Sequence, residues 1–270
     1  MTRAGPGVLL TALVLVAGCR EEKPAEPLTS LAPPPLAPLA ADPVDAGGGD
    51  DALFRLAPAE VYGEEVPAQA LRLELAGEAV RLGSQSFTPS RPAEASSLAE
   101  GVRGKAVLVV PDADSFMAQT SELLEVLRDS AAEVWLKHPD AAVAYRLVLR
   151  DEEGFREWLA EVAPGKLRII QRSDGFELST SVGKLPGGDP NGPSVPVRGG
   201  KQDIATLRKG LERLKGRFKT AEDLCLVPSF GTEVAQAARA LSGVYTALGE
   251  PLFETLCLIY PTPPRRSDGG

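Results

Sequence analysis

Two carboxylates stand directly after a segment with the character of a strand. Asp112 and Asp114 follow the apolar run 106–110 and Pro111. Carboxylates in this place could act as a nucleophile or as an acid–base group in a hydrolysis reaction. They could instead lie in a strand-to-helix loop, where Asp is favoured because it accepts local backbone hydrogen bonds and faces the positive end of a helix dipole.

Other candidates for catalysis are few. The single histidine, His138, would have to serve any Ser-His-Asp triad, and a zinc site needs about four ligands. His138 lies in "KHPD", just past an expected strand, which favours an exposed loop residue over a catalytic base. The chain has no G-x-S-x-G, and the glycine-rich segment 183–193 lacks the spacing of a phosphate-binding loop. We therefore expect a protein that is not an enzyme and holds no metal or cofactor, with hydrolysis by Asp112 and Asp114 as the alternative.

Cysteine chemistry is most distinctive at the N-terminus. Residues 1–19 contain one Arg, an apolar stretch at 8–17 and small residues before Cys19. The stretch is too short for a membrane-spanning helix of about 20 apolar residues and has the length of a signal-peptide core. Its end, "LVAGC", resembles the lipobox of bacterial lipoproteins, which implies that Cys19 becomes a lipidated N-terminus. An ordinary secretory signal cleaved near Ala17 is the alternative.

Two further cysteines lie in apolar runs, Cys225 in "LCLV" and Cys257 in "TLCLIYP". A free cysteine packs well as a small hydrophobic residue, so we expect both to be buried and unpaired. A disulfide is the alternative, because a secreted protein meets an oxidising compartment.

The segment after the signal peptide cannot form a core. Residues 19–67 are rich in Pro, Ala and Gly without a sustained apolar period, which predicts a disordered tether that holds the folded part away from the membrane. Residues 264–270 are expected to be a disordered tail. A net charge of −8 and an aromatic content of 5% argue against nucleic acid as a partner.

The elements that carry these residues follow one pattern twice. With Pro111 aligned on Pro228, an offset of 117 residues, each copy has an apolar run ending at Pro, a hydroxyl residue suited to a helix N-cap, an amphipathic helix and a second short strand. A strand, helix and strand with this crossover length imply two parallel neighbouring strands. The matched residues include Ser115 with Thr232 and Leu124 with Leu241.

Alternating hairpin patterns at 71–87 and 166–182 precede the two copies, and a helical pattern at 202–218 precedes the second strand pair. The sequence therefore predicts an α+β protein with two tandem β-β-α-β-α-β modules, 68–140 and 166–263, each with a small mixed sheet packed against helices. The connector 141–165 is expected to contain an amphipathic helix. That helix would pack through Phe155, Trp158, Leu159 and Val162. The last helix is expected to carry an apolar stripe of Val234, Ala238, Leu241, Tyr245 and Leu248.

This order of elements, with "DLCLVPSFGTEVAQAARALSGVY" in the second copy, resembles the periplasmic domain of the ExbD/TolR family. The likeness is one of pattern, and the family's "PY" after the strand is "GT" at 231–232. Family members also carry a transmembrane helix with an Asp for proton coupling, whereas residues 1–19 hold no acidic residue. The resemblance therefore implies the envelope-side module of a biopolymer-transport protein without its proton-coupling part.

The carboxylate pair also resembles a second family. A strand followed by Asp-x-Asp is similar to the motif of the haloacid dehalogenase family, which implies Asp112 as nucleophile and Asp114 as acid–base group. Pro111 directly before the motif, and the absence of an acid in the matching "PSFGT", argue against this relationship.

We therefore expect a non-catalytic, lipid-anchored binding or assembly protein of the cell envelope, facing the periplasm. Arg20 after Cys19 favours the outer membrane. The alternatives are the Asp-based phosphohydrolase and a solute-binding lipoprotein. The two modules are hypothesised to pair within the chain as a pseudo-dimer, with two separate binding modules as the alternative.

A basic helix face is the candidate partner surface. Its contacts would be other envelope proteins or peptidoglycan carboxylates, and a solvated helix face is the alternative reading. Its residues are Arg208, Lys209, Arg213, Lys215 and Arg217.

Substitution of Cys19→Ala should release the protein from membranes or leave an unprocessed precursor, because acyl chains are the only strong membrane attachment that the sequence predicts. Fractionation and electrophoretic migration in the producing bacterium measure both effects. Lys23→Ala, which keeps the thiol, is the matched control. A Cys19→Ala protein that fractionates and migrates like wild type would show that the lipobox assignment is wrong.

Overall fold

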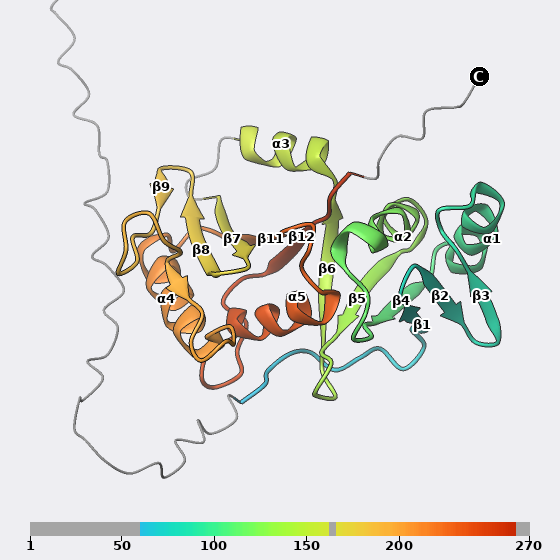
Figure 1. The fold of residues 1–270 in the computed structure, drawn as a ribbon, viewed down its shortest axis with the longest axis horizontal. Helices are drawn as coiled ribbons and strands as arrows, with labels where there is room; N and C mark the ends of the chain where they lie inside the picture. The colour runs from blue at the N-terminus through green and yellow to red at the C-terminus, as the bar shows by residue number, and fades with distance from the viewer. Residues whose placement is uncertain (1–59, 162–165, 263–270) are drawn as a thin grey trace, which may run out of the picture. The chain divides into compact units, whose positions relative to one another are not determined.

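The computed structural model describes residues 60–161 and 166–262 (Figure 1). The expected signal peptide, Cys19, residues 19–59 of the expected tether, and the expected C-terminal tail lie outside the described residues. Within the described ranges, five α-helices accompany one twelve-stranded mixed sheet. The mixed α and β class is confirmed.

The first half of the sheet matches the strand pattern expected at 68–140. Strands β1 and β2 form an antiparallel hairpin, while β1 with β4 and β4 with β5 are parallel pairs. Gly77 allows the tight hairpin turn, because its φ of +63° is a conformation that other residues adopt at a cost. The elements are β1 (Leu71–Ala76), β2 (Ala79–Leu82), β3 (Gln85–Phe87), α1 (Pro92–Val102), β4 (Ala106–Val110), α2 (Met117–Ser130) and β5 (Glu133–Lys137).

The second half has the same local order. Strands β7 and β8 form an antiparallel hairpin, while β7 with β11 and β11 with β12 are parallel pairs. Only glycine fits at Gly175 in the hairpin turn, because a Cβ there would collide with the carbonyl oxygen of Val195. The elements are β7 (Leu167–Arg172), β8 (Gly175–Thr180), β9 (Gly183–Lys184), β10 (Val195–Pro196), α4 (Ile204–Arg217), β11 (Asp223–Pro228), α5 (Val234–Leu241), a 3₁₀ turn (Ser242–Val244) and β12 (Thr255–Ile259).

Strand β6 (Ala144–Arg150) joins the two halves into one sheet, where the sequence led us to expect a separate small sheet for each copy. It pairs antiparallel with β5 and parallel with β12, so β5 and β12 run in opposite directions on its two sides. The sequence analysis had placed this segment in the connector. The connector does supply the expected helix, α3 (Glu152–Ala160). The order across the sheet is β10-β8-β7-β11-β12-β6-β5-β4-β1-β2-β3, with β9 paired to β8.

The halves also meet through the loops that lead into α2 and α5. The Met117 N–H donates to the carbonyl oxygen of Thr232 at 2.9 Å, and the Val234 N–H donates to that of Ser115 at 2.9 Å. The offset of 117 that aligns the two copies places Met117 on Val234 and Ser115 on Thr232, so the two bonds are equivalent under this alignment. Such reciprocity is expected of units related by a two-fold axis. The duplication itself remains a prediction.

The expected N-cap role of Ser115 and Thr232 is wrong. The N-cap residues are Phe116 and Glu233, one position later. The Ser115 hydroxyl donates to the carbonyl oxygen of Gly77, and the Thr232 hydroxyl lies 2.9 Å from that of Ser229. These two hydroxyls stabilise loops. The helix N–H groups that they were expected to cap bond instead to the other half of the protein, Met117 to Thr232 and Val234 to Ser115.

The two faces of the sheet are covered differently. A continuous buried cluster lies between one face and the helices α1, α2, α4 and α5. On the other face, Trp158 of α3 packs on Ile259, Cys225 and Cys257. The packing role predicted for Trp158 in the connector helix is thus present. Figure 1 shows α3 on one side of β11 and β12 and α5 on the other. Phe155 stacks on Trp158, and Val162 lies outside the described residues.

Cys225 and Cys257 form a disulfide, so the expectation that they are unpaired is wrong. They are directly opposite one another in the parallel pair β11–β12, with Cα atoms 4.4 Å apart. Their side chains therefore emerge on the same face, beneath α3. Apolar runs in the sequence reveal burial but not this register.

The expected apolar stripe on the last helix is also wrong in part, because α5 ends at Leu241 and a 3₁₀ turn follows. Tyr245 is buried from an extended segment, and Leu248 is 86% exposed. At Gly243 a Cβ would lie 3.0 Å from the Leu207 side chain, so the chain approaches α4 closely where the helix was expected to continue.

Leu124→Ala and Leu241→Ala should each lower the free energy of unfolding by about 2–5 kcal/mol, because both leave a cavity in the main core. The two side chains are 6% and 1% exposed. Urea unfolding of the chain from residue 20 measures the effect. Leu248→Ala is the matched control and should change the free energy of unfolding by less than about 0.5 kcal/mol. Equal effects at all three positions would contradict this packing.

Candidate functional site

Asp112, the expected nucleophile of the hydrolase alternative, organises a loop between β4 and α2. Its carboxylate accepts the backbone N–H groups of Gly77 at 2.9 Å, Ser115 at 2.8 Å and Asp114 at 3.3 Å. Asp114 itself is exposed. Asp112 thus ties the β1–β2 turn to the start of α2, as the strand-to-helix loop interpretation predicts.

The ionisation of Asp112 follows from these contacts. Partial burial raises the pKa of this carboxyl, but hydrogen bonds from Ser115, Gly77 and Asp114 outweigh burial and hold the pKa below its usual value. Since the folded pKa is depressed, the charged form stabilises the fold above about pH 4, and this contribution is lost as the pH falls through the folded pKa.

His138 is buried, so the expected exposed loop position is wrong. Its Nδ1 accepts the Asp140 N–H at 3.1 Å, and its ring meets the edge of Tyr145 at a centroid distance of 6.3 Å. Its backbone N–H closes the β5–β6 turn on Val143. Burial lowers the pKa of the imidazole. The turn back into β6, which the sequence analysis missed, is what buries the ring.

The basic face of α4 is used largely within the protein. Arg208 donates to the carbonyl oxygen of Glu60 at 3.0 Å and lies 5.1 Å over the Tyr62 ring. Lys215 donates to the carbonyl oxygen of Ala221 and lies 5.4 Å from the centre of the Phe253 ring. The other three predicted partner-surface residues also take part in interactions: Lys209, Arg213 and Arg217.

A cleft of about 680 Å³ opens where β7 and β11 end. These strands are parallel, so their carboxyl ends lie at the same edge of the sheet, the usual place for ligands in sheets of this kind. Three cations line the cleft: Arg172, Lys201 and Arg239. Its neutral polar side chains are Ser173, Gln202, Ser229, Thr232 and Gln236, and its described lining contains no carboxylate.

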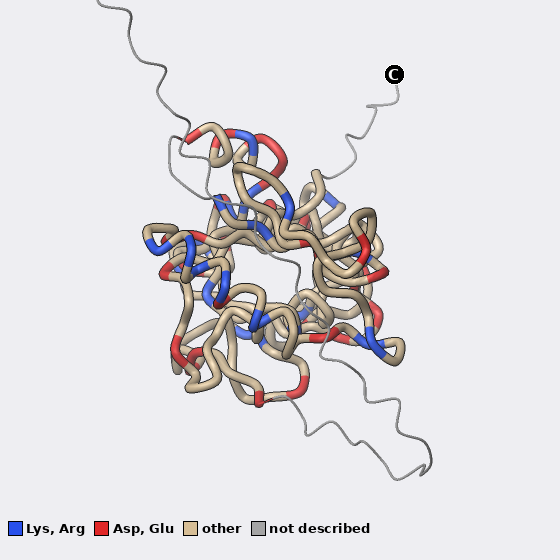
Figure 2. The backbone as a smooth tube through the Cα atoms, turned by 90° about the vertical axis from the view of Figure 1, so that its left-hand side faces the viewer, with Lys and Arg blue, Asp and Glu red and all other residues tan. Residues whose placement is uncertain are grey.

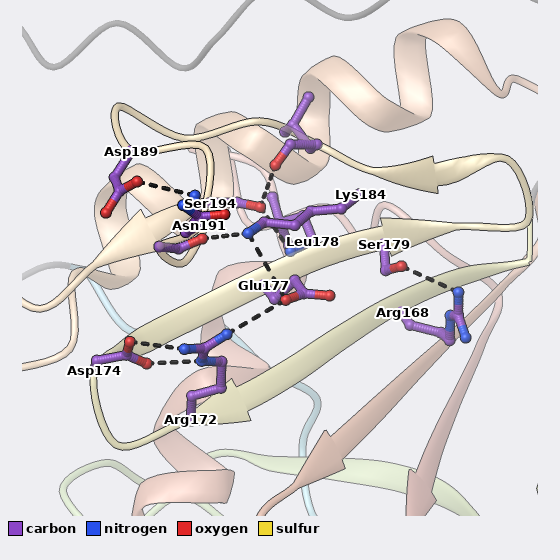
Figure 3. A network of polar contacts seen from close by, with 12 residues as sticks. Arg168, Arg172, Asp174, Glu177, Leu178, Ser179, Lys184, Asp189, Asn191 and Ser194 are labelled. Atoms are coloured by element: carbon purple, nitrogen blue, oxygen red, sulfur yellow. Dashed lines mark hydrogen bonds and ion pairs between the residues drawn. The ribbon is translucent and has the colours of Figure 1, made fainter.

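Carboxylates outside the cleft hold two of these cations in place. Arg172 makes a two-point contact with Asp174, at 2.8 and 2.9 Å, on the β7–β8 hairpin (Figure 3). Arg239 makes a two-point contact with Asp140, at 2.8 and 3.3 Å. These hydrogen bonds raise the pKa of both guanidinium groups, which stay charged.

A buried glutamine next to the cleft lining has a side-chain oxygen without a hydrogen-bond partner in the described part of the chain. Gln171 is 1% exposed, and its Nε2 donates to the Oε1 of Gln202 at 3.0 Å. Its own Oε1 has no hydrogen-bond partner among the described residues. The backbone carbonyl of Gln171 accepts the N–H of Ser229, which fixes one wall of the cleft.

A second cleft, of about 770 Å³, lies among α1, α2 and α3 and has the opposite character. Its charged lining is one cation, Arg156, with six carboxylates: Glu122, Glu125, Asp129, Asp151, Glu152 and Glu153. Acidic surface is the expected background in a chain with a net charge of −8. Figure 2 shows positive and negative residues interspersed along the backbone, so the cationic lining of the first cleft is local.

The cleft lined by Arg172, Lys201 and Arg239, which we call the cationic cleft, was not predicted from the sequence. Its residues come from the end of β7, from 197–204, from the loop after β11 and from α5. The available signal was the change from apolar to polar residues at two strand ends, "QRS" and "PSF". Lys201 and Arg239 had no local signal.

In the described ranges, no group of His, Cys, Asp and Glu is arranged to hold a metal, and no helix has the length and apolar character needed to cross a membrane. Comparison with protein-family models, curated proteins and solved structures finds no match for this chain.

Asp112→Asn should lower the free energy of unfolding at pH 7 by about 1 kcal/mol, because it weakens charge-assisted hydrogen bonds to backbone N–H groups. The difference from wild type should shrink below about pH 4, where the wild-type carboxylate also becomes protonated. Urea unfolding as a function of pH measures this.

Asp114→Asn is the matched control and should leave stability nearly unchanged. Hydrolysis of p-nitrophenyl phosphate by wild type, lost in both variants, would instead establish the hydrolase alternative.

Proposed function

We propose that this protein is a non-catalytic binding and assembly protein of the cell envelope, held at a membrane by acyl chains on Cys19 and related in role to the periplasmic part of ExbD/TolR biopolymer-transport proteins. Its two halves act as one intramolecular pair. The reciprocal bonds of Met117 to Thr232 and of Val234 to Ser115 are the observation that carries the proposal.

The sheet supports an intramolecular pair. Alone, each half would leave a strand edge open, β5 in the first and β12 in the second, and open edges promote association between chains. Here both edges are paired with β6. The outer strands β3 and β10 have three and two residues, so they offer little edge for further pairing. Assembly with other proteins would therefore use loops and helix faces.

The hydrolase alternative is less well supported. Its nucleophile would be Asp112, whose carboxylate already accepts three backbone N–H groups. A structural role accounts for this residue without a substrate. The solute-binding alternative rests on the cationic cleft.

The chain from residue 20 should be a monomer in sedimentation velocity, whereas the copies 68–140 and 166–263 expressed alone should self-associate or be unstable, because each then exposes the edge that β6 covers. A dimeric two-copy chain together with stable monomeric single copies would rule out the intramolecular pair.

Crosslinking in intact cells tests the envelope role. The wild-type protein should give discrete crosslinked species with envelope proteins, and Cys19→Ala should lose them if it is released from the membrane. The absence of any such species from correctly anchored wild type would count against an assembly function.

A further inference from the structure

The charged side chains that line the cationic cleft are opposite in sign to the net charge of the chain. The net charge is −8, yet the charged side chains that line this cleft are Arg172, Lys201 and Arg239. Carboxylates dominate the other large cleft, as expected from composition alone. The described lining of this concavity contains no carboxylate. Carboxylates outside the lining pair with the two arginines, so the uncompensated charge of Lys201 is what attracts anions.

The three cations come from separate places in the fold. Arg172 ends β7, Lys201 lies in the loop before α4, and Arg239 lies on α5. Asp174 and Asp140 hold the two guanidinium groups by two-point contacts. A guanidinium has five N–H donors, so the contact with Asp140 leaves donors of Arg239 for a ligand oxygen. Arg172, by contrast, also faces Glu177 at 3.6 Å. The groups are thus positioned before any ligand arrives, which reduces the entropy cost of binding.

Lys201 is the least compensated of the three. It is exposed, and none of the described side chains forms an ion pair with it. The acid closest along the chain, Asp203, accepts from Thr206 at the start of α4 and pairs with Arg198 at 3.1 Å. The positive charge of Lys201 is therefore the one most available to a ligand.

Neutral groups complete a binding site of defined chemistry. Gln202 in the lining accepts a hydrogen bond from the buried Gln171, whose own amide oxygen has no partner among the described residues, and an unpaired buried polar atom is costly. Phe230, between the lining residues Ser229 and Gly231 in the sequence, is 63% exposed.

We propose that this cleft binds a small organic anion that carries at least two carboxylate or phosphate groups. The volume of about 680 Å³ suits a small molecule, since ligand sites usually measure about 300–1,000 Å³. Oxyanion groups would contact Lys201 and the arginines, and the organic part would lie against Val197 and Ile204. This proposal is independent of the envelope role.

Isothermal titration calorimetry on the chain from residue 20 tests the proposal. The probes are citrate and succinate, which carry several carboxylates, and 3-phosphoglycerate, which carries one phosphate and one carboxylate. Inorganic phosphate, a single anion, serves for comparison, and the four are compared at the same ionic strength. At least one organic probe should bind saturably, raise the melting temperature of the protein and lose affinity as sodium chloride increases. The relative affinities of the probes identify which oxyanion the cleft prefers.

Two variants locate the binding. Lys201→Gln removes one charge and should weaken binding by about tenfold, the usual effect of losing one charge-assisted contact. Gly231→Leu keeps every charge but fills space in the cleft, and it should abolish binding. A Cβ at Gly231 meets no atom within 4 Å, so this variant should fold normally. Lys219→Gln, an equal change of charge at an exposed position outside the cleft lining, is the matched control and should bind like wild type.

The proposal is overturned if none of the three organic probes binds saturably up to about 10 mM, a range that covers even weak millimolar sites. It is also overturned if a probe binds but Lys201→Gln and Gly231→Leu bind it as tightly as wild type, because the site would then lie elsewhere. If Lys219→Gln weakens probe binding as strongly as Lys201→Gln does, the probe is attracted by the net charge of the protein. That outcome would also exclude a specific site in the cleft.

Discussion

Strand β6 is hydrogen-bonded along both edges, antiparallel to β5 and parallel to β12. A strand interior to a sheet must place every backbone N–H and C=O in a ladder, so its position fixes the strands on either side. Its alternating side chains add to this constraint, because Tyr145, Leu147 and Leu149 all join the main core. Without β6, the two halves would be separate small sheets, each with an open edge.

Because β5 and β12 run in opposite directions on the two sides of β6, the segments before α2 and α5 can meet. There 115–117 and 232–234 form reciprocal backbone hydrogen bonds. The same junction borders the cationic cleft, since Thr232 lines it and Arg239 reaches across to Asp140 of the β5–β6 turn. The way in which the two halves pack against each other therefore also determines part of the shape of the cleft.

Sequence reasoning was most accurate where the signal was local. The two hairpins, both parallel strand pairs and the packing of Trp158 were predicted, because each depends on apolar periodicity within a short segment. Asp112 was placed in the correct loop for the same reason. The missed strand β6 also had a local signal, the alternation of "AYRLVLR", which was assigned instead to the connector around α3.

What the sequence by itself determined is the two hairpins, the two parallel strand pairs and the helices that accompany them, since these follow from the spacing of residues near one another in the chain. Only the tertiary structure decided that the strands form one sheet, that Cys225 faces Cys257, that His138 is buried and that three distant cations share a cleft. Each of these depends on strand register and on contacts between segments far apart in the sequence. No local pattern encodes such contacts, because they are selected by the packing of the whole chain.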